Sequence, residues 1–363
     1  MTDREHQRLD FLNASGLSQA IRAPLPGDAS SRRYERLTMP SGATLMLMDQ
    51  APNAESPPCD PAWTPEERQA HGWNAVARLS AGRIEAFAAV ADHFREDCGL
   101  STPAIVAVDA RRGFAVIEDF GDALFARVIE NGQDEAQLYL EAVEALARLH
   151  LTATYPDVLP GPGGGWPLQV YDAVALQGGA DLFVEWLPKL VPELTFDADA
   201  IAEWREAWAP IAAMGEARAW VIAHRDYHAE NLIWLPEREN FRRVGMIDFQ
   251  DAVLAHPVWD LHSLLQDARR DVSPEIEAMA LDRYFDIMMV DREAYLADYA
   301  ALAAMNEARI LGIFARLIAR DGKPRYRAFM PRMWAHLNRN LTKPGLEGVA
   351  AWFYRHVPGE IRA

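Results

Sequence analysis

Residues 224–231 read HRDYHAEN. The third position, Asp226, is a carboxylate that can orient a hydroxyl group and accept its proton. The last position, Asn231, offers an amide oxygen, which is a suitable ligand for a hard cation such as Mg²⁺. The segment must bend for both side chains to reach one centre. It therefore predicts a loop that combines a general base with a metal ligand.

A second carboxylate follows a predicted β-hairpin. Residues 232–235 and 244–247 are short apolar runs joined by a charged turn, a pattern that indicates two paired strands. Asp248 comes directly after the second run, and we expect it to hold the metal together with Asn231. This order matches the catalytic loop and the Asp-Phe-Gly segment of phosphoryl-transfer kinases. Gln250 stands where that segment has glycine.

Other polar residues near this loop have less specific interpretations. A lone His-x-Asp pair is usually structural, so His224 and Asp260 are expected to brace the loop by hydrogen bonds. Asp251 is either a carboxylate behind the metal ligands or a turn residue. His228 either faces a substrate or is simply exposed to solvent.

Composition and charge exclude several classes of protein. The chain has 363 residues, 50% of them hydrophobic and 25% charged, a mixture that supports a large folded core. A net charge of −17 disfavours nucleic-acid binding. No apolar run is long enough for a transmembrane helix, and we expect no membrane partner. Two cysteines without metal-like spacing and a charged N-terminus favour a cytoplasmic location. The oligomeric state is not indicated.

The first third of the chain predicts a small sheet with one main helix. Residues 34–38 and 44–48 are strand-like runs around a Pro-Ser-Gly turn, and 105–108 and 114–118 form a second such pair. Residues 83–98 have helical periodicity.

Helices dominate the remainder of the chain. Residues 197–215 and 295–319 are predicted helices, and the change from mixed to helical structure falls near residues 119–122. The fold class is therefore α+β, with a small sheet-containing part followed by a large helical part.

The motif residues resemble those of the aminoglycoside phosphotransferase and choline kinase-like superfamily. The resemblance implies a protein kinase-like bilobal fold, with residues 1–119 as a nucleotide-binding N-lobe. Residues 120–363 would form a C-lobe with the catalytic loop and sugar-binding helices. ATP would be the co-substrate and Mg²⁺ the cofactor. Asp226 would be the base, and it would meet the metal ligands in a cleft between the lobes.

One segment before residue 123 resembles the hinge of this superfamily. Residues 117–122 read IEDFGD. The resemblance implies that the backbone around Glu118 and Phe120 binds adenine.

Two segments far apart in the chain narrow the resemblance to kinases of cell-wall amino sugars. Residues 27–34 read GDASSRRY, and residues 311–326 contain GIFARL and RDGKPRY. Kinases of this group phosphorylate the C1 hydroxyl of N-acetylmuramate and N-acetylglucosamine in peptidoglycan recycling. The resemblance therefore implies a small amino sugar as the second substrate.

The usual phosphate-binding lysine of kinases has no counterpart here, because the first lysine of the chain is Lys189. Arginine binds phosphate bidentately and can take this part. Adjacent strand residues point to opposite faces, so only one of two neighbouring arginines should reach the nucleotide. We expect this to be Arg33 or, failing that, Arg32, with Ser30 and Ser31 contacting phosphate. The alternative is a pair of surface arginines.

Four further residues are candidates with open alternatives. Glu85 either pairs with the phosphate-binding arginine or is solvated on its helix. Glu185 and Trp186 either contact the sugar or, for the tryptophan, pack in the core. Arg316 either binds the lactyl carboxylate of N-acetylmuramate or forms an ordinary salt bridge.

Two other functions stay open at this point. The first is another kinase of the same superfamily, acting on an aminoglycoside, choline or homoserine, which the acidic charge balance would suit. The second is an inactive kinase-like binding module, which the missing lysine suggests.

Overall fold

The structure, a computed structural model, describes residues 3–26, 32–51, 57–152 and 155–362. The chain divides into two compact units, each built from two segments. Unit 1 contains Met1–Gln169 and Ala229–Ala252, and unit 2 contains Val170–His228 and Val253–Ala363. Across the described parts of the chain, no helix combines the length and apolar character needed to cross a membrane.

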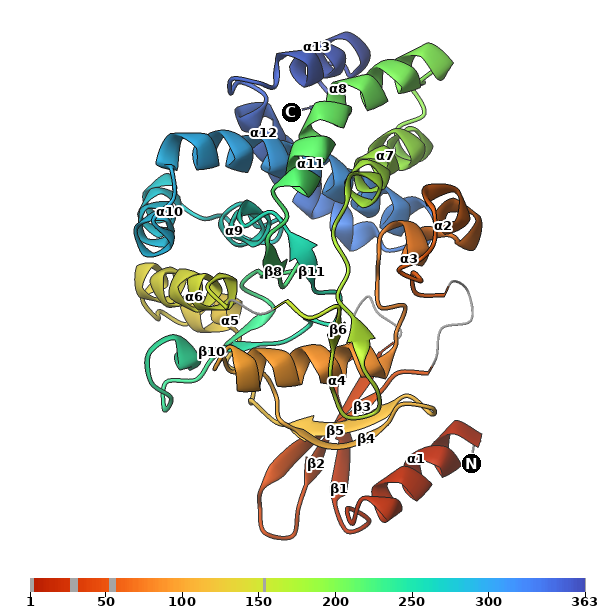
Figure 1. Ribbon diagram of the computed structural model, residues 1–363, viewed down its shortest axis with the longest axis vertical. Coiled ribbons are helices and arrows are strands. Elements are labelled where there is room, and N and C mark those ends of the chain that lie inside the picture. The colour runs from red at the N-terminus through yellow and green to blue at the C-terminus, as the bar shows by residue number, and fades with distance from the viewer. Residues whose placement is uncertain (1–2, 27–31, 52–56, 153–154, 363) are drawn as a thin grey trace. The chain divides into compact units, whose positions relative to one another are not determined.

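Unit 1 is built on a five-stranded antiparallel sheet in the order β1-β2-β3-β5-β4 (Figure 1). The strands are β1 (Ile21–Pro24), β2 (Arg33–Thr38), β3 (Thr44–Asp49), β4 (Ile105–Asp109) and β5 (Phe114–Glu118). The turn between β2 and β3 contains Gly42, whose φ of 86° is readily adopted by glycine. The strand pairs predicted from alternation and turn residues are therefore confirmed.

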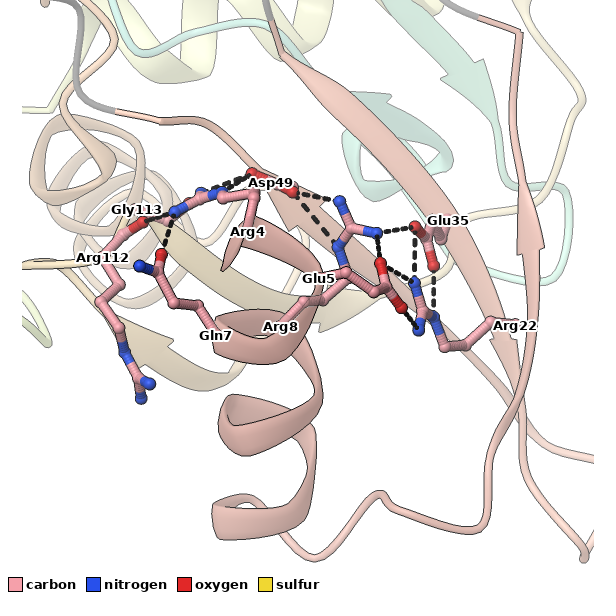
Figure 2. A network of polar contacts seen from close by, with 9 residues as sticks. All are labelled: Arg4, Glu5, Gln7, Arg8, Arg22, Glu35, Asp49, Arg112 and Gly113. Atoms are coloured by element: carbon pink, nitrogen blue, oxygen red, sulfur yellow. Dashed lines mark hydrogen bonds and ion pairs between the residues drawn. The ribbon is translucent and has the colours of Figure 1, made fainter. Parts of the chain in front are cut away.

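One face of this sheet is covered by α1 (Asp3–Ala14). Phe11 and Leu12 of the helix pack with sheet residues that include Leu37 and Leu47 in one buried cluster. Charged residues surround this contact, and Figure 2 shows Arg4 and Arg8 of the helix reaching Asp49 at the end of β3. Burial of the apolar residues and several coupled ion pairs thus fix the end of β3.

The opposite face of the sheet carries α4 (Ile84–Asp92), which continues into one turn of π-helix, η1 (His93–Asp97) (Figure 1). Together these elements match the helix predicted over 83–98, and Gly99 follows with a φ of 72°. Phe249 is fully buried against this helix, with ring centroids 4.8 Å from Phe87 and 5.8 Å from Phe94. The helix therefore holds the segment that contains Asp248.

Unit 1 also contains the hairpin that was predicted between the two motifs. It is formed by β9 (Leu232–Trp234) and β10 (Val244–Met246), with Ile233 opposite Gly245. The remaining elements of unit 1 are α2 (Pro65–His71), α3 (Trp73–Val76), α5 (Phe125–Glu130), α6 (Glu135–His150), β6 (Val158–Leu159), β7 (Trp166–Pro167) and η2 (Asn240–Arg243).

Unit 2 is a helical assembly with one short strand pair, β8 (Val221–Ala223) and β11 (Val253–Ala255). Its central helix, α11 (Arg292–Ala319), packs against α7, α8, α9 and α12 (Figure 1). The other elements are α7 (Ala173–Leu190), α8 (Ala198–Ala217), α9 (Val258–Leu265), α10 (Pro274–Met288), η3 (Pro324–Phe329), α12 (Met330–Asn340) and α13 (Glu347–His356). The helices predicted over 197–215 and 295–319 are confirmed as α8 and α11.

The contact between α7 and α11 depends on Gly312. A Cβ at this position would lie 2.4 Å from the backbone carbon of Leu182, so only glycine allows this close approach. Phe183, the next residue of α7, stacks on Trp204 with ring centroids 5.2 Å apart in an aromatic core. The GIFARL segment therefore contributes to the packing of α7 on α11, in addition to carrying part of the resemblance described above.

The α+β fold class predicted from the sequence is confirmed. The two compact units do not follow the expected lobe boundary, because residues 120–169 and 229–252 fold with the N-terminal sheet. The packing of these segments does not show which of them bind nucleotide and which carry the catalytic residues. The assignment of residues 1–119 to nucleotide binding and 120–363 to catalysis and sugar binding therefore stays a prediction.

Candidate active site

The two expected metal ligands lie side by side at one end of the β9–β10 hairpin. The backbone N–H of Ile247 donates to the carbonyl oxygen of Asn231 at 3.1 Å, which joins the residue before β9 to the residue after β10. The Asp248 side chain is 40% exposed and so accessible to an ion. No cluster of three or more His, Cys, Asp or Glu suited to a metal occurs among the described residues. One carboxylate and one amide oxygen nevertheless fit Mg²⁺, which binds few protein ligands and retains water.

The backbone at Asp248 is strained. Its φ of 63° lies in the left-handed region, which is uncommon for residues other than glycine. Burial of the neighbouring Phe249 in the α4 contact holds this conformation. The amide of Gln250 donates to Asp248 Oδ1 at 3.1 Å. The residue that replaces the usual glycine therefore orients the carboxylate.

Arg32 is the arginine that reaches this carboxylate. Its Nη1 donates to Asp248 Oδ1 at 2.9 Å, and its Nε donates to Gln50 Oε1 at 2.7 Å. Its side chain is buried. Arg32 and Tyr34 lie two residues apart and share one face, and Arg32 Nη1 also donates to the Tyr34 hydroxyl at 3.2 Å.

Arg33 is exposed at the start of β2, where it pairs with Asp49 in the strand register. Within unit 1, Arg32 thus contacts the expected metal ligand Asp248, while the choice between the two arginines as the phosphate-binding residue stays a prediction. Ser30 and Ser31 lie outside the described residues. Glu85 accepts a hydrogen bond from Arg83 Nη2 at 2.5 Å, so one of its partners is a neighbour on the chain.

The predicted hinge is anchored by packing within unit 1. The Glu118 N–H donates to the Ala104 carbonyl at 2.9 Å, and the Glu118 carboxylate accepts from Arg238 Nη2 at 2.6 Å. The Arg238 guanidinium also lies 4.8 Å from the Phe120 ring centroid. A Cβ at Gly245 would lie 2.9 Å from the same ring. These side chains thus position the segment, while adenine binding by its backbone stays a prediction.

The catalytic loop begins in unit 2 and is held by Asp260 of α9. The backbone N–H groups of His224 and Arg225 donate to the two carboxylate oxygens of Asp260 at 2.6 and 2.8 Å. Arg225 has a φ of 79°, and its guanidinium lies 4.4 Å from the Tyr171 ring centroid. His224 Nδ1 accepts from the Asp226 N–H at 3.3 Å. These are the contacts that the expected bracing role of His224 and Asp260 requires.

Asp226 follows this braced turn with its side chain 54% exposed. Its carboxylate lies 3.3 Å from Nε2 of the buried His228, and Arg269 Nη1 lies 3.1 Å from the same nitrogen. Partial desolvation of the half-exposed Asp226 carboxylate raises its pKa, but His228 and Arg269 lower it more, so the pKa lies below its ordinary value. Burial lowers the pKa of His228, and Asp226 raises it above its ordinary value. His228 is therefore neither simply exposed nor distant from the proposed base.

The candidate sugar contacts lie on α7 and α11 of unit 2. Trp186 is partly exposed and does not belong to the aromatic core. The Lys189 ammonium lies 3.6 Å from its ring centroid, and the Arg320 guanidinium lies at 6.0 Å. Glu185 is exposed and lies 3.5 Å from Lys189. A sugar that stacked on Trp186 would have to displace a cation from the ring.

Arg316 lies among other arginines on α11. Burial lowers its pKa, and the charge of Arg320 lowers it further, with a smaller contribution from Arg309. Asp321 and Glu185 act in the opposite direction. A carboxylate ligand would offset the positive charge of these arginines, and the expected contact with a lactyl group would supply such a carboxylate.

Four side chains near the motifs were not predicted from the sequence: Gln50, Arg238, Gln250 and Arg269. Each acts through a neighbour that the sequence did single out. Gln50 lies two residues after a predicted strand, and Gln250 replaces a glycine, which are the only signals that the sequence offered. The partners of Arg238 and Arg269 become apparent only in the fold.

The chain belongs to the phosphotransferase enzyme family, whose model matches residues 21–305. A choline/ethanolamine kinase family protein from Mesorhizobium loti has a similar fold, with a TM-score of 0.57 at 16% identity over 96% of this chain and 98% of that one. The superfamily resemblance expected from the motifs is thereby confirmed.

Curated relatives narrow the comparison. A protein of Caulobacter vibrioides is 53% identical over 99% of both chains and is named N-acetylmuramate/N-acetylglucosamine kinase. A protein of Pseudomonas putida with the same name is 27% identical over 87% of this chain and 82% of its own.

Proposed function

We propose that this protein transfers the γ-phosphoryl group of ATP to the anomeric C1 hydroxyl of N-acetylmuramate or N-acetylglucosamine, as a step in peptidoglycan recycling. The observation that carries the proposal is 53% identity over 99% of both chains with a kinase named for these two sugars. The residues proposed for the chemistry are all present: the side chains of Asp226 and Asp248 are partly exposed, and the buried Asn231 accepts a backbone hydrogen bond from Ile247.

Asp226 is the proposed base. Its carboxylate orients the C1 hydroxyl and takes its proton as that oxygen forms a bond to the γ-phosphorus. The bond between the γ-phosphorus and the β,γ-bridging oxygen breaks, and ADP leaves. A low pKa keeps Asp226 ionised, which is sufficient because an anomeric hydroxyl is more acidic than an ordinary alcohol and positioning supplies most of the rate in this reaction class.

Asn231 and Asp248 are the proposed ligands of a magnesium ion, which when bound offsets negative charge on the phosphates. Arg32 is proposed to bind phosphate in place of the missing lysine, with Ser30, Ser31 and Arg33 from the same segment as further candidates. Glu118 and Phe120 mark the proposed adenine-binding backbone, and Glu85 is kept among the nucleotide-binding candidates.

The sugar side of the proposal rests on unit 2. Arg316 and its neighbouring arginines suit the lactyl carboxylate of N-acetylmuramate, whereas N-acetylglucosamine has no such group. Glu185, Trp186 and His228 are the other proposed contacts. A cytoplasmic location is proposed because the two cysteines, Cys59 and Cys98, are buried and not joined in a disulfide.

The proposal is tested by measuring ADP release with four acceptors: N-acetylmuramate, N-acetylglucosamine, kanamycin and choline. We expect turnover with at least one of the two sugars and ³¹P and ¹³C NMR signals of a C1 phosphate. Turnover only with kanamycin or choline would instead assign another phosphotransferase of the superfamily. ATP binding without turnover on any acceptor would assign a binding module.

A further inference from the structure

The guanidinium of Arg32 is hydrogen-bonded to the Asp248 carboxylate, which the proposed function assigns as a metal ligand. Arg32 Nη1 donates to Asp248 Oδ1 at 2.9 Å, and the amide of Gln250 donates to the same oxygen at 3.1 Å. The arginine side chain is only 7% exposed, whereas the carboxylate is 40% exposed. The cation is therefore the fixed partner of the pair, and the carboxylate is the partner that a ligand can reach.

Gln50 fixes the cation. Its Oε1 accepts from Arg32 Nε at 2.7 Å, and its backbone N–H donates to the Gly113 carbonyl at 2.9 Å. It directly follows Asp49, which the arginines of α1 hold at the end of β3 (Figure 2). Gly82 leaves room for its amide, because a Cβ there would lie 2.7 Å from Gln50 Nε2.

We infer that Arg32 is an internal cation that neutralises Asp248 and competes with a divalent metal ion for it, and that Gln50 is the positioning residue that holds it there. The inference rests on the proposed function, since it takes Asp248 as a metal ligand. A divalent ion that arrives alone must compete with the guanidinium for Asp248. An ion that arrives with a triphosphate brings oxygens to which the guanidinium can turn, since arginine binds phosphate bidentately.

Arg32 therefore has effects of opposite sign on two ligands. It weakens binding of the metal alone and strengthens binding of the metal–nucleotide pair, and so it couples the two. A side chain that merely supported the local fold would change both affinities in the same direction. The sign of the two changes is the readout that separates these roles.

The experiment measures Mn²⁺ binding to the full chain by electron paramagnetic resonance, first with the metal alone and then with a non-hydrolysable ATP analogue. For Arg32→Ala we expect Mn²⁺ alone to bind roughly tenfold more tightly, because the substitution removes a charge that competes for the partly exposed Asp248 carboxylate. The same variant should bind the analogue roughly tenfold more weakly, because a charge-assisted phosphate contact is lost.

Three further variants complete the test. Arg111→Ala removes the same charge from the exposed turn between β4 and β5, and we expect its affinity for Mn²⁺ alone to match the wild type within about twofold, because the exposed charge is screened. Gln50→Ala leaves Arg32 in place but unheld, so it should shift both affinities in the same directions as Arg32→Ala by a smaller factor. It also keeps the inference testable if Arg32→Ala does not fold. Asp248→Asn should lose binding of the metal alone.

Failure of the inference and failure of the proposed function give different results. If Asp248→Asn loses Mn²⁺ but neither Arg32→Ala nor Gln50→Ala binds Mn²⁺ more tightly, the internal-cation inference is wrong and the metal assignment stands. If Asp248→Asn binds Mn²⁺ like the wild type, the metal assignment itself is wrong, and the inference fails with it.

Discussion

Substitution of the buried Glu307 by glutamine should stabilise the protein at alkaline pH and much less at acid pH. Glu307 lies on α11 and is only 3% exposed, and one of its carboxylate oxygens accepts from Asn340 Nδ2 at 2.8 Å. Burial raises the pKa of Glu307 from 4.5 to about 8. The folded protein therefore retains a proton that the unfolded chain releases above its own pKa.

The sign and size of the effect follow from proton linkage. Because the folded pKa is raised, Glu307 costs no stability below the unfolded pKa of 4.5, and the cost grows as the pH rises toward about 8. At about 1.4 kcal/mol per pK unit, the cost that develops between pH 5 and pH 8 is about 3 kcal/mol. Glutamine cannot ionise, so Glu307→Gln removes this cost while its amide oxygen still accepts from Asn340.

Urea unfolding at a series of pH values measures the effect. The difference in unfolding free energy between Glu307→Gln and the wild type should increase by about 3 kcal/mol from pH 5 to pH 8. Glu293→Gln, at an exposed glutamate at the start of the same helix, is the matched control, and the change for Glu307→Gln is measured relative to it. A pH-independent difference for Glu307→Gln would refute the reasoning.

Three further outcomes follow from the contacts. His228→Ala should move the acid limb of the pH–rate profile to higher pH, because it removes one of the groups that lower the pKa of Asp226; an unmoved limb would contradict this. Gly312→Ala should lower the free energy of unfolding, measured by urea denaturation, by about 1–3 kcal/mol, because its Cβ would overlap the α7 backbone. Gly348→Ala, with open space around the new Cβ, should not lower it. Arg316→Ala should raise the KM for N-acetylmuramate roughly tenfold and leave that for N-acetylglucosamine nearly unchanged, since only the first sugar offers a carboxylate; equal changes would argue against the contact.

Local patterns predicted the elements that depend on local chemistry. The β2–β3 hairpin followed from alternation and a Pro-Ser-Gly turn, and the Asn231–Asp248 pair followed from two apolar runs that had to form adjacent strands. The helix α1 was missed because its exposed face is strongly charged, and only Phe11 and Leu12 are buried. α7 was missed because two glycines and a proline interrupt its pattern, although packing on α11 stabilises it.

The choice between Arg32 and Arg33 shows where sequence reasoning ends. Alternation required that one of the two face away from the nucleotide, but it did not say which face of the sheet α1 would cover. The buried cluster around Leu37 shows that α1 covers the face of the sheet that carries Leu37 and Arg33. By alternation, Arg32 lies on the opposite face. The positions of Gln50 and Arg269 likewise depend on segments far apart in the chain.

The central claim, that Asp226 is the base of a phosphoryl transfer, is tested most directly by the single-turnover rate of Asp226→Asn with saturating ATP, Mg²⁺ and N-acetylmuramate. Asparagine retains the shape of the side chain but cannot accept the proton. The account predicts a rate about 10²–10⁴-fold below that of the wild type, with the same quantity of bound nucleotide. A variant that transfers phosphate at the wild-type rate would contradict it.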